Sequence, residues 1–75
     1  MTERNIKLNT IEDVKKFVGV VFRYEYDVDV VSGRYAVDAK SILGLFSIDL
    51  SKEVVMKVHS SECHELLNEL KDFIV

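Results

Sequence analysis

The middle of the chain reads Ser32-Gly33-Arg34-Tyr35-Ala36-Val37-Asp38-Ala39-Lys40-Ser41-Ile42-Leu43-Gly44-Leu45-Phe46-Ser47. Ser32-Gly33 is a tight-turn pair, and the residues after it alternate as a strand with Tyr35 and Val37 facing inward. Residues 41–47 are too apolar for a loop and are followed by a turn-like Asp49-Leu50-Ser51, which indicates a short helix. The stretch therefore predicts the second half of a hairpin followed by a short helix.

Toward the N-terminus, the hydrophobic period separates two strands from one helix. Alternation over residues 24–30 predicts a strand with one wet side, whose inward residues are Tyr24, Tyr26, Val28 and Val30. Residues 11–21 have the spacing of a helix with one buried face, formed by Ile11, Val14, Phe17, Val18 and Val21. Thr10 is placed to cap this helix in a weak capping box with Asp13. Residues 5–9 predict a first strand with Ile6 and Leu8 inward.

Toward the C-terminus, the pattern predicts one more strand and a closing helix. Val54, Met56 and Val58 alternate with Val55, Lys57 and His59. The closing helix, capped by Ser60 or Ser61, has a buried face formed by Cys63, Leu66, Leu67, Leu70 and Phe73 or Ile74.

The resulting order, β-α-β-β-α-β-α, predicts an α/β (α+β) open-faced sandwich. A four-stranded antiparallel sheet would carry three helices on one face and leave the other face to solvent. This order alone does not separate the strand order 1-4-2-3 from a ferredoxin-like one, because both share it. The short middle helix favours the first.

Lys40-Ser41-Ile42-Leu43-Gly44 matches, position by position, a pentapeptide of HPr phosphocarrier proteins, in which it follows a turn glycine and an extended strand. The chain resembles an HPr domain over nearly its whole length. The resemblance implies the strand order 1-4-2-3 and a place in the sugar phosphotransferase system.

In Gram-positive HPr proteins the serine matching Ser41 is phosphorylated by an ATP-dependent kinase, and the apolar residues after it bind partners. The resemblance thus implies Ser41 as candidate phosphosite, with candidate partner-binding residues Lys40, Ile42, Leu43 and Phe46. A serine at a helix start faces unpaired N–H groups and the positive end of the dipole, where a phosphate is tolerated. The alternatives are a plain N-cap for Ser41 and core packing for the apolar residues. Since a two-turn helix cannot turn all of these inward, we expect at least one large exposed side chain.

The resemblance breaks where an HPr phosphocarrier holds its Gly-Ile/Leu-His-Ala/Thr-Arg-Pro run, with the histidine that takes phosphate. The corresponding join reads Leu8-Asn9-Thr10-Ile11-Glu12-Asp13-Val14, without histidine, arginine or proline. Glu12 and Asp13 place negative charge where a phosphoryl group needs positive charge. We interpret both acids as complementing the dipole of the first helical turn.

The other chemically active residues lie elsewhere and indicate no metal site. His59 ends the fourth strand, and His64 begins the last helix beside Glu62 and Cys63. Neighbouring helix residues point in different directions, while a metal needs three or four converging ligands. We expect two surface histidines, a buried Cys63, no metal and no cofactor.

Composition limits the remaining function classes. The 75 residues, 48% of them hydrophobic and 31% charged, predict a single folded domain, residues 1–75. Such a chain buries only about 60% of its unfolded surface, so we expect a protein that acts through its surface and not an enzyme. Ten scattered Lys and Arg among thirteen acids argue against direct nucleic acid binding. With one cysteine and no long apolar run, we expect a cytoplasmic location, without export or membrane insertion.

Our leading hypothesis is an HPr-like regulatory or docking protein in carbon catabolite control, similar to HPr paralogues that lost the histidine and kept the serine. Its implied partners are an HPr kinase and a catabolite-control transcription factor. Two alternatives stay open. One is a phosphocarrier of the sugar phosphotransferase system with an unidentified carrier residue, and the other is a small ferredoxin-like interaction module unrelated to phosphate transfer.

Overall fold

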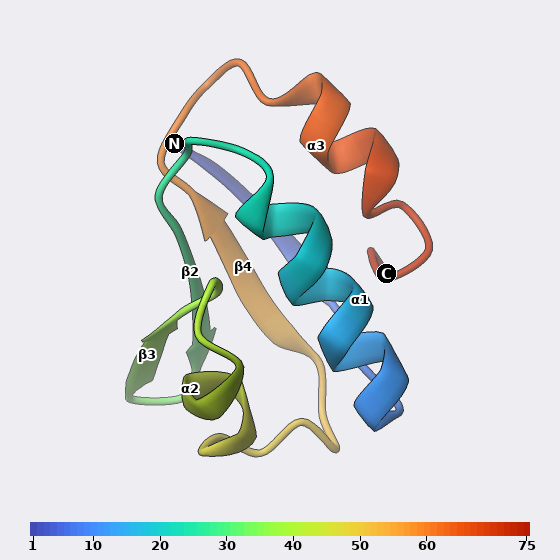
Figure 1. Cartoon of the computed structure of the whole chain (residues 1–75). Coiled ribbons are helices and arrows are strands. Elements are labelled where there is room, and N and C mark those ends of the chain that lie inside the picture. Colours follow the sequence, from blue (N-terminus) through green and yellow to red (C-terminus); the bar gives the residue numbers. More distant parts are fainter.

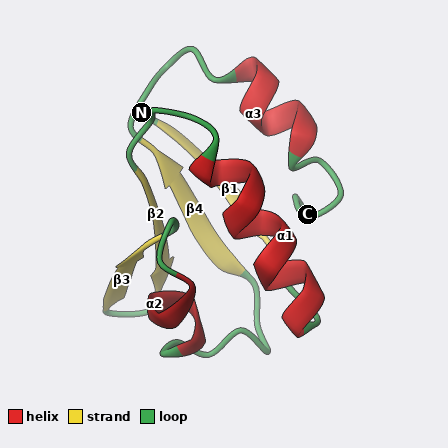
Figure 2. Ribbon diagram, viewed as in Figure 1, coloured by secondary structure: helices red, strands yellow, loops and turns green.

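The computed structural model describes all 75 residues as a four-stranded antiparallel sheet with three helices on one face (Figure 1). Its elements, in chain order, are β1 (Thr2–Ile6), α1 (Ile11–Phe22), β2 (Val28–Ser32), β3 (Tyr35–Asp38), α2 (Ile42–Phe46), β4 (Val54–Val58) and α3 (His64–Glu69). Figure 2 shows the helices layered over the sheet. None of the three helices combines the length and the apolar character that a membrane crossing requires.

The strand order is β1-β4-β2-β3, which confirms the predicted 1-4-2-3 arrangement. A ferredoxin-like sheet would pair the first and third strands at its centre. Here β1 lies at one edge and pairs with β4, while β3 lies at the other edge and pairs with β2. The ferredoxin-like alternative is therefore wrong.

The core lies between the sheet and the helices, as the alternation in the central strands predicted. Val28, Val30, Val54, Met56 and Val58 are all buried on the helix side of β2 and β4. Phe17 of α1 packs edge to face against Phe73, with ring centroids 6.3 Å apart. The core is wholly apolar, because no polar or charged residue is buried.

Helix α1 begins as predicted, but its first residue does not join the core. The Thr10 side chain accepts a hydrogen bond from the Asp13 N–H at 3.0 Å, and the Asp13 carboxylate accepts one from the Asn9 N–H at 3.0 Å. The arrangement resembles the predicted capping box, except that the Asp13 carboxylate accepts from Asn9, one residue before the N-cap Thr10. The inward prediction for Ile11 is wrong, because this residue is 62% exposed where the first helical turn extends beyond the sheet.

The first strand was predicted at residues 5–9, and this prediction is wrong. β1 spans Thr2–Ile6 because its backbone pairs with β4 from Thr2 opposite Val58 to Ile6 opposite Val54. Beyond Ile6 the Lys7 N–H turns to the Phe73 carbonyl at 2.9 Å, which ends the strand. An edge strand can carry polar side chains, so alternation is a poor guide to its limits. Leu8 is nevertheless buried, in the loop.

The second strand was predicted to begin at Tyr24, but β2 begins at Val28, where its pairing with β4 starts. Tyr24 and Tyr26 lie in the connection from α1, half-buried and stacked with centroids 5.8 Å apart. The Tyr24 hydroxyl donates to the Glu69 carboxylate and the Tyr26 hydroxyl to the Glu62 carbonyl. A side chain buried in the apolar core would not find such partners.

In β3, Val37 is half-buried on the helix side as predicted, but the core prediction for Tyr35 is wrong, because this residue is 70% exposed. Tyr35 lies at the hairpin end of an edge strand, opposite Ser32. The turn itself is confirmed by Gly33, whose φ of 59° is a left-handed conformation that favours glycine.

Helix α3 does not use the predicted caps. Its N-cap is Cys63, which makes no side-chain capping hydrogen bond, and the Ser60 hydroxyl instead accepts from the Glu62 N–H at 3.1 Å. Ser60 lies in the turn before the helix, upstream of the N-cap position, so it does not cap α3. Cys63 is buried, as expected.

Candidate functional site

Ser41 is the N-cap of α2, held by hydrogen bonds on both sides. Its Oγ accepts from the Gly44 N–H at 3.1 Å, and its carbonyl accepts from the Leu45 N–H at 3.0 Å. The Ser41 N–H donates to the Asp38 carbonyl at 3.0 Å, at the end of β3. Ser41 as a whole is half-buried. The capping role that the sequence predicted for Ser41 is confirmed.

Gly44 keeps the space around that hydroxyl open. A Cβ on this residue would lie 3.3 Å from Ser41 Oγ and 3.4 Å from the Val37 Cβ of β3. The first of these contacts is tighter than ordinary van der Waals packing, so a side chain would press on the serine. Glycine allows α2 to lie against β3 with the Ser41 hydroxyl beside it.

The apolar residues of α2 divide between core and surface. Leu45 is fully buried and Ile42 is half-buried, while Leu43 is 80% and Phe46 is 47% exposed. The expectation of at least one exposed large side chain is confirmed. We call Ile42, Leu43 and Phe46 the α2 patch; it begins directly after Ser41.

A groove of about 370 Å³ runs from the α2 patch to the start of α1. Phe46 and Ile48 line one side and Thr10 and Ile11 the other, with Leu50 among the remaining lining residues. Phe46 belongs both to the groove and to the patch. Ile11 is the residue that sequence reasoning missed, and its place at the first helical position was the only signal that it could extend beyond the core.

Lys40 is anchored and does not extend freely into solvent. Its Nζ donates to the Tyr24 carbonyl at 2.8 Å, across the connection between α1 and β2. Its own N–H donates to the Asp38 carboxylate at 2.9 Å. The Lys40 ammonium group therefore holds the segment before Ser41 against the connection between α1 and β2. It is already hydrogen-bonded in the absence of a protein partner.

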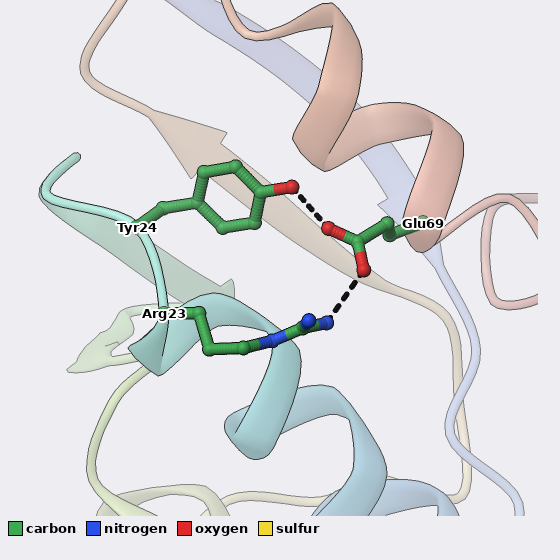
Figure 3. Close-up of polar contacts among 3 residues, drawn as sticks. All are labelled: Arg23, Tyr24 and Glu69. Carbon is green, nitrogen blue, oxygen red and sulfur yellow. Dashed lines mark hydrogen bonds and ion pairs between the residues drawn. The ribbon is translucent and has the colours of Figure 1, made fainter.

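Figure 3 shows how the connection that Lys40 contacts is itself tied to α3. The Tyr24 hydroxyl donates to one oxygen of Glu69, and the Arg23 guanidinium pairs with the other at 2.5 Å. The hydrogen bond to Glu69 raises the pKa of Tyr24 to about 12. The hydrogen bond from the Tyr24 hydroxyl is the main cause that lowers the pKa of Glu69, and the hydrogen bond from Arg23 is the second. Three residues thus link the end of α1 to the end of α3.

The position that holds the carrier histidine in the HPr resemblance contains Asn9 and Thr10, at the start of α1. The Thr10 hydroxyl already accepts the capping bond from Asp13, so its lone pairs face the helix. Both histidines lie away from this groove. His59 Nε2 lies 2.8 Å from an Asp29 carboxylate oxygen at the far end of the sheet, and His64 is exposed at the start of α3.

Comparison with known proteins places the chain among HPr structures. HPr-C-His from Thermoanaerobacter tengcongensis superimposes with a TM-score of 0.80 at 23% identity, covering 96% of this chain and 89% of that one. The phosphocarrier protein HPr from Bacillus anthracis gives 0.73 at 19% identity, with coverages of 99% and 96%. The catabolite repression protein Crh of Bacillus subtilis, solved as an intertwined dimer with a swapping domain, gives 0.66 at 22% identity, covering 93% and 87%.

No family model and no curated protein matches the sequence. The structural likeness therefore carries the comparison, and at these identities it speaks to architecture. The strand order, the three helices on one face and the superpositions together show that this chain has the fold of the HPr phosphocarrier proteins.

Proposed function

We propose that this chain is an HPr-like docking protein that receives phosphate on Ser41 and does not relay phosphate to sugars. It would be a single-domain cytoplasmic protein of the phosphotransferase system that acts in carbon catabolite control. Its partners would be an HPr kinase and a catabolite-control transcription factor. It would bind these proteins through its surface, without catalysis.

The observation that carries the proposal is the composite surface at the start of α2. The half-buried Ser41 lies in the same helical segment as Leu43 and Phe46, which are exposed large apolar side chains. Phosphorylation would add about −1.5 to −2 charges beside this apolar surface. Partner side chains that pair with phosphate and cover Phe46 would then bind the two features together.

The missing carrier supports the second half of the proposal. No histidine lines the groove at the start of α1, where the resemblance places the phosphate-accepting residue. Glu12 and Asp13 occupy the first turn there, and no arginine accompanies them. A phosphoryl group arriving at this turn would meet the two acids, and Lys7, which lines the groove, already donates its ammonium group to the Leu50 carbonyl at 3.1 Å.

The alternative is a phosphocarrier with a different carrier residue, which the HPr fold itself favours. His59 is the residue to consider, because it is exposed and adjoins a hollow between Asp27 and Asp38. The three carboxylates of Asp27, Asp29 and Asp38 around that hollow would repel a phosphoryl donor. We therefore favour the docking protein.

The test is incubation with an HPr kinase and ATP, followed by mass spectrometry of the intact chain and its peptides. Wild type should gain one phosphoryl group on the peptide containing Ser41. Ser41→Ala should gain none, while Ser47→Ala, which removes the exposed serine at the other end of α2, should be phosphorylated as wild type is. Phosphate on Ser47, or none on any variant, would contradict the proposal.

A further inference from the structure

The two edges of the sheet differ in how their backbone groups are used. Beside β1, the C-terminal segment covers the edge, since Val75 N–H donates to the Asn5 carbonyl at 3.0 Å and the Phe73 carbonyl accepts from Lys7 N–H. No further strand pairs with the outer edge of β3. An uncovered edge strand is a template for pairing with another strand.

The hairpin geometry shows which β3 groups face outward. The Ala39 N–H donates to the Val28 carbonyl at 2.8 Å, directly after the register in which Asp38 lies opposite Asp29. Because antiparallel partners alternate between bonded and non-bonded pairs, Tyr35 and Val37 direct their backbone groups toward β2. Ala36 and Asp38 therefore direct theirs away from the sheet, where the Asp38 carbonyl already accepts one hydrogen bond, from the Ser41 N–H at 3.0 Å, and the groups of Ala36 pair with no other strand. No lysine or proline protects this strand.

The sequence of this edge is complementary to itself. If two copies pair in antiparallel fashion with Ala36 opposite Ala36, Arg34 of each copy lies opposite Asp38 of the other. In the same register Tyr35 lies opposite Val37. Opposite charges and aromatic with β-branched side chains are favourable cross-strand pairs. A shift by two residues in either direction would remove both ion pairs.

The charged side chains of β3 and its turn also favour a second copy of this chain as the partner. Asp38 lies directly opposite Asp29 in the β2–β3 ladder, and like charges in that position are unfavourable. Asp29 has the His59 imidazole 2.8 Å from its carboxylate and lies opposite Lys57 in β4, but Asp38 accepts only the Lys40 backbone N–H and has no cationic side chain bound. Arg34 is exposed and has no acid bound to it. A second copy would supply to each group the charge that it lacks.

We propose that the outer edge of β3 pairs with a second copy of this chain, with Ala36 opposite Ala36, so that two sheets join into one. This pairing goes beyond the docking function proposed above and requires no phosphate. It would cover Tyr35, which is 70% exposed on the helix side of the strand. Only the five residues from Arg34 to Asp38 of each copy pair, which makes a small interface, so the dimer forms reversibly.

Sedimentation equilibrium over a range of protein concentrations tests the proposal. Wild type should show a monomer–dimer equilibrium. Arg34→Asp and Asp38→Arg should each raise the dissociation constant about tenfold or more, because both ion pairs become like-charge pairs. An equimolar mixture of these two variants should restore dimers, since in the mixed pair every facing charge is opposite.

Two further variants separate the pairing from general charge and folding effects. Ala36→Pro removes the central outward N–H from an edge strand, so it should stay folded by circular dichroism and remain monomeric. Lys52→Asp makes the same change in charge as Arg34→Asp in an exposed turn and should dimerise as wild type does. Wild type that stays monomeric would overturn the proposal. So would a dimer that survives Arg34→Asp, as one made by strand exchange would.

Discussion

At the residue scale, the start of α2 places the Ser41 hydroxyl near exposed apolar side chains while the helix stays capped and packed on the core. Ser41 caps the helix through its hydroxyl, and Gly44 gives that hydroxyl room against β3. Leu45 turns into the core and fixes the helix there. Because Leu45 carries the packing, Leu43 and Phe46 are available to a partner.

This division predicts different results for two neighbouring substitutions. Phe46→Ala should weaken binding of the partner to the Ser41-phosphorylated protein by roughly 1–3 kcal/mol, because large side chains dominate interface energies. Its effect on the free energy of unfolding should be small. Leu45→Ala should instead destabilise the fold by about 2–5 kcal/mol, because it leaves a cavity in the core. Calorimetric titration and urea unfolding of both variants supply the two quantities.

Equal partner binding by wild type and Phe46→Ala would place the functional surface elsewhere. The open face of the sheet around Asp27, Asp29 and Lys57 is then the next surface to test. Phosphate-dependent binding should also weaken with added salt, because part of its energy comes from cations on the partner.

At the scale of elements, the link from Arg23 and Tyr24 to Glu69 predicts how stability depends on pH. The pKa of Tyr24 is raised from its usual 10.0 to about 12 in the fold. The hydroxyl therefore contributes stability that is complete below about pH 10 and is lost as the pH rises through about 12. The pKa of Glu69 is lowered, so its contribution is present above the usual carboxyl range and is lost as the pH falls through the lowered value.

Tyr24→Phe measures this contribution directly. Its free energy of unfolding should fall below that of wild type near neutral pH, and the difference should shrink as the pH rises from about 10 to about 12. Tyr35→Phe removes an exposed hydroxyl that makes no hydrogen bond, so it should follow wild type throughout. A wild-type advantage over Tyr24→Phe that stays constant through this range would show that the link does not titrate as described.

The same scale shows which elements the sequence could predict. β4 and α1 were found because each buries one face, and burial produces a period that can be read. β1 was misplaced because hydrogen bonding to β4, which leaves no trace in side-chain alternation, sets its limits. Tyr35 has the inward parity of a core residue but lies at the end of an edge strand, beyond the helices.

The candidate site was predictable to a similar degree. The role of Ser41 as an N-cap follows from its local sequence, and the exposure of α2 follows from the number of apolar residues in two turns. The groove with Ile11 and the bond from Lys40 to Tyr24 depend on segments that only the fold brings together. Such contacts between distant parts of the chain have no signature in a single sequence.

At the scale of the whole molecule, the chain has the fold of the HPr proteins, and the connection from β1 to α1 contains no histidine. The sheet order and the three helices are those of the HPr fold, and Ser41 is the N-cap of α2. The start of α1 contains Thr10 as N-cap and two acids, Glu12 and Asp13, in its first turn. In the proposed function, the surface at α2 binds partner proteins and the chain does not pass phosphate on to sugars.

Incubation with phosphoenolpyruvate and the general phosphotransferase enzyme tests this central claim most directly. A histidine-containing HPr serves as positive control, and mass spectrometry under neutral and acid conditions reads the product. The account predicts that HPr gains an acid-labile phosphoryl group while this chain gains none. An acid-labile phosphohistidine at His59 or His64, lost in His59→Gln or His64→Gln, would contradict it.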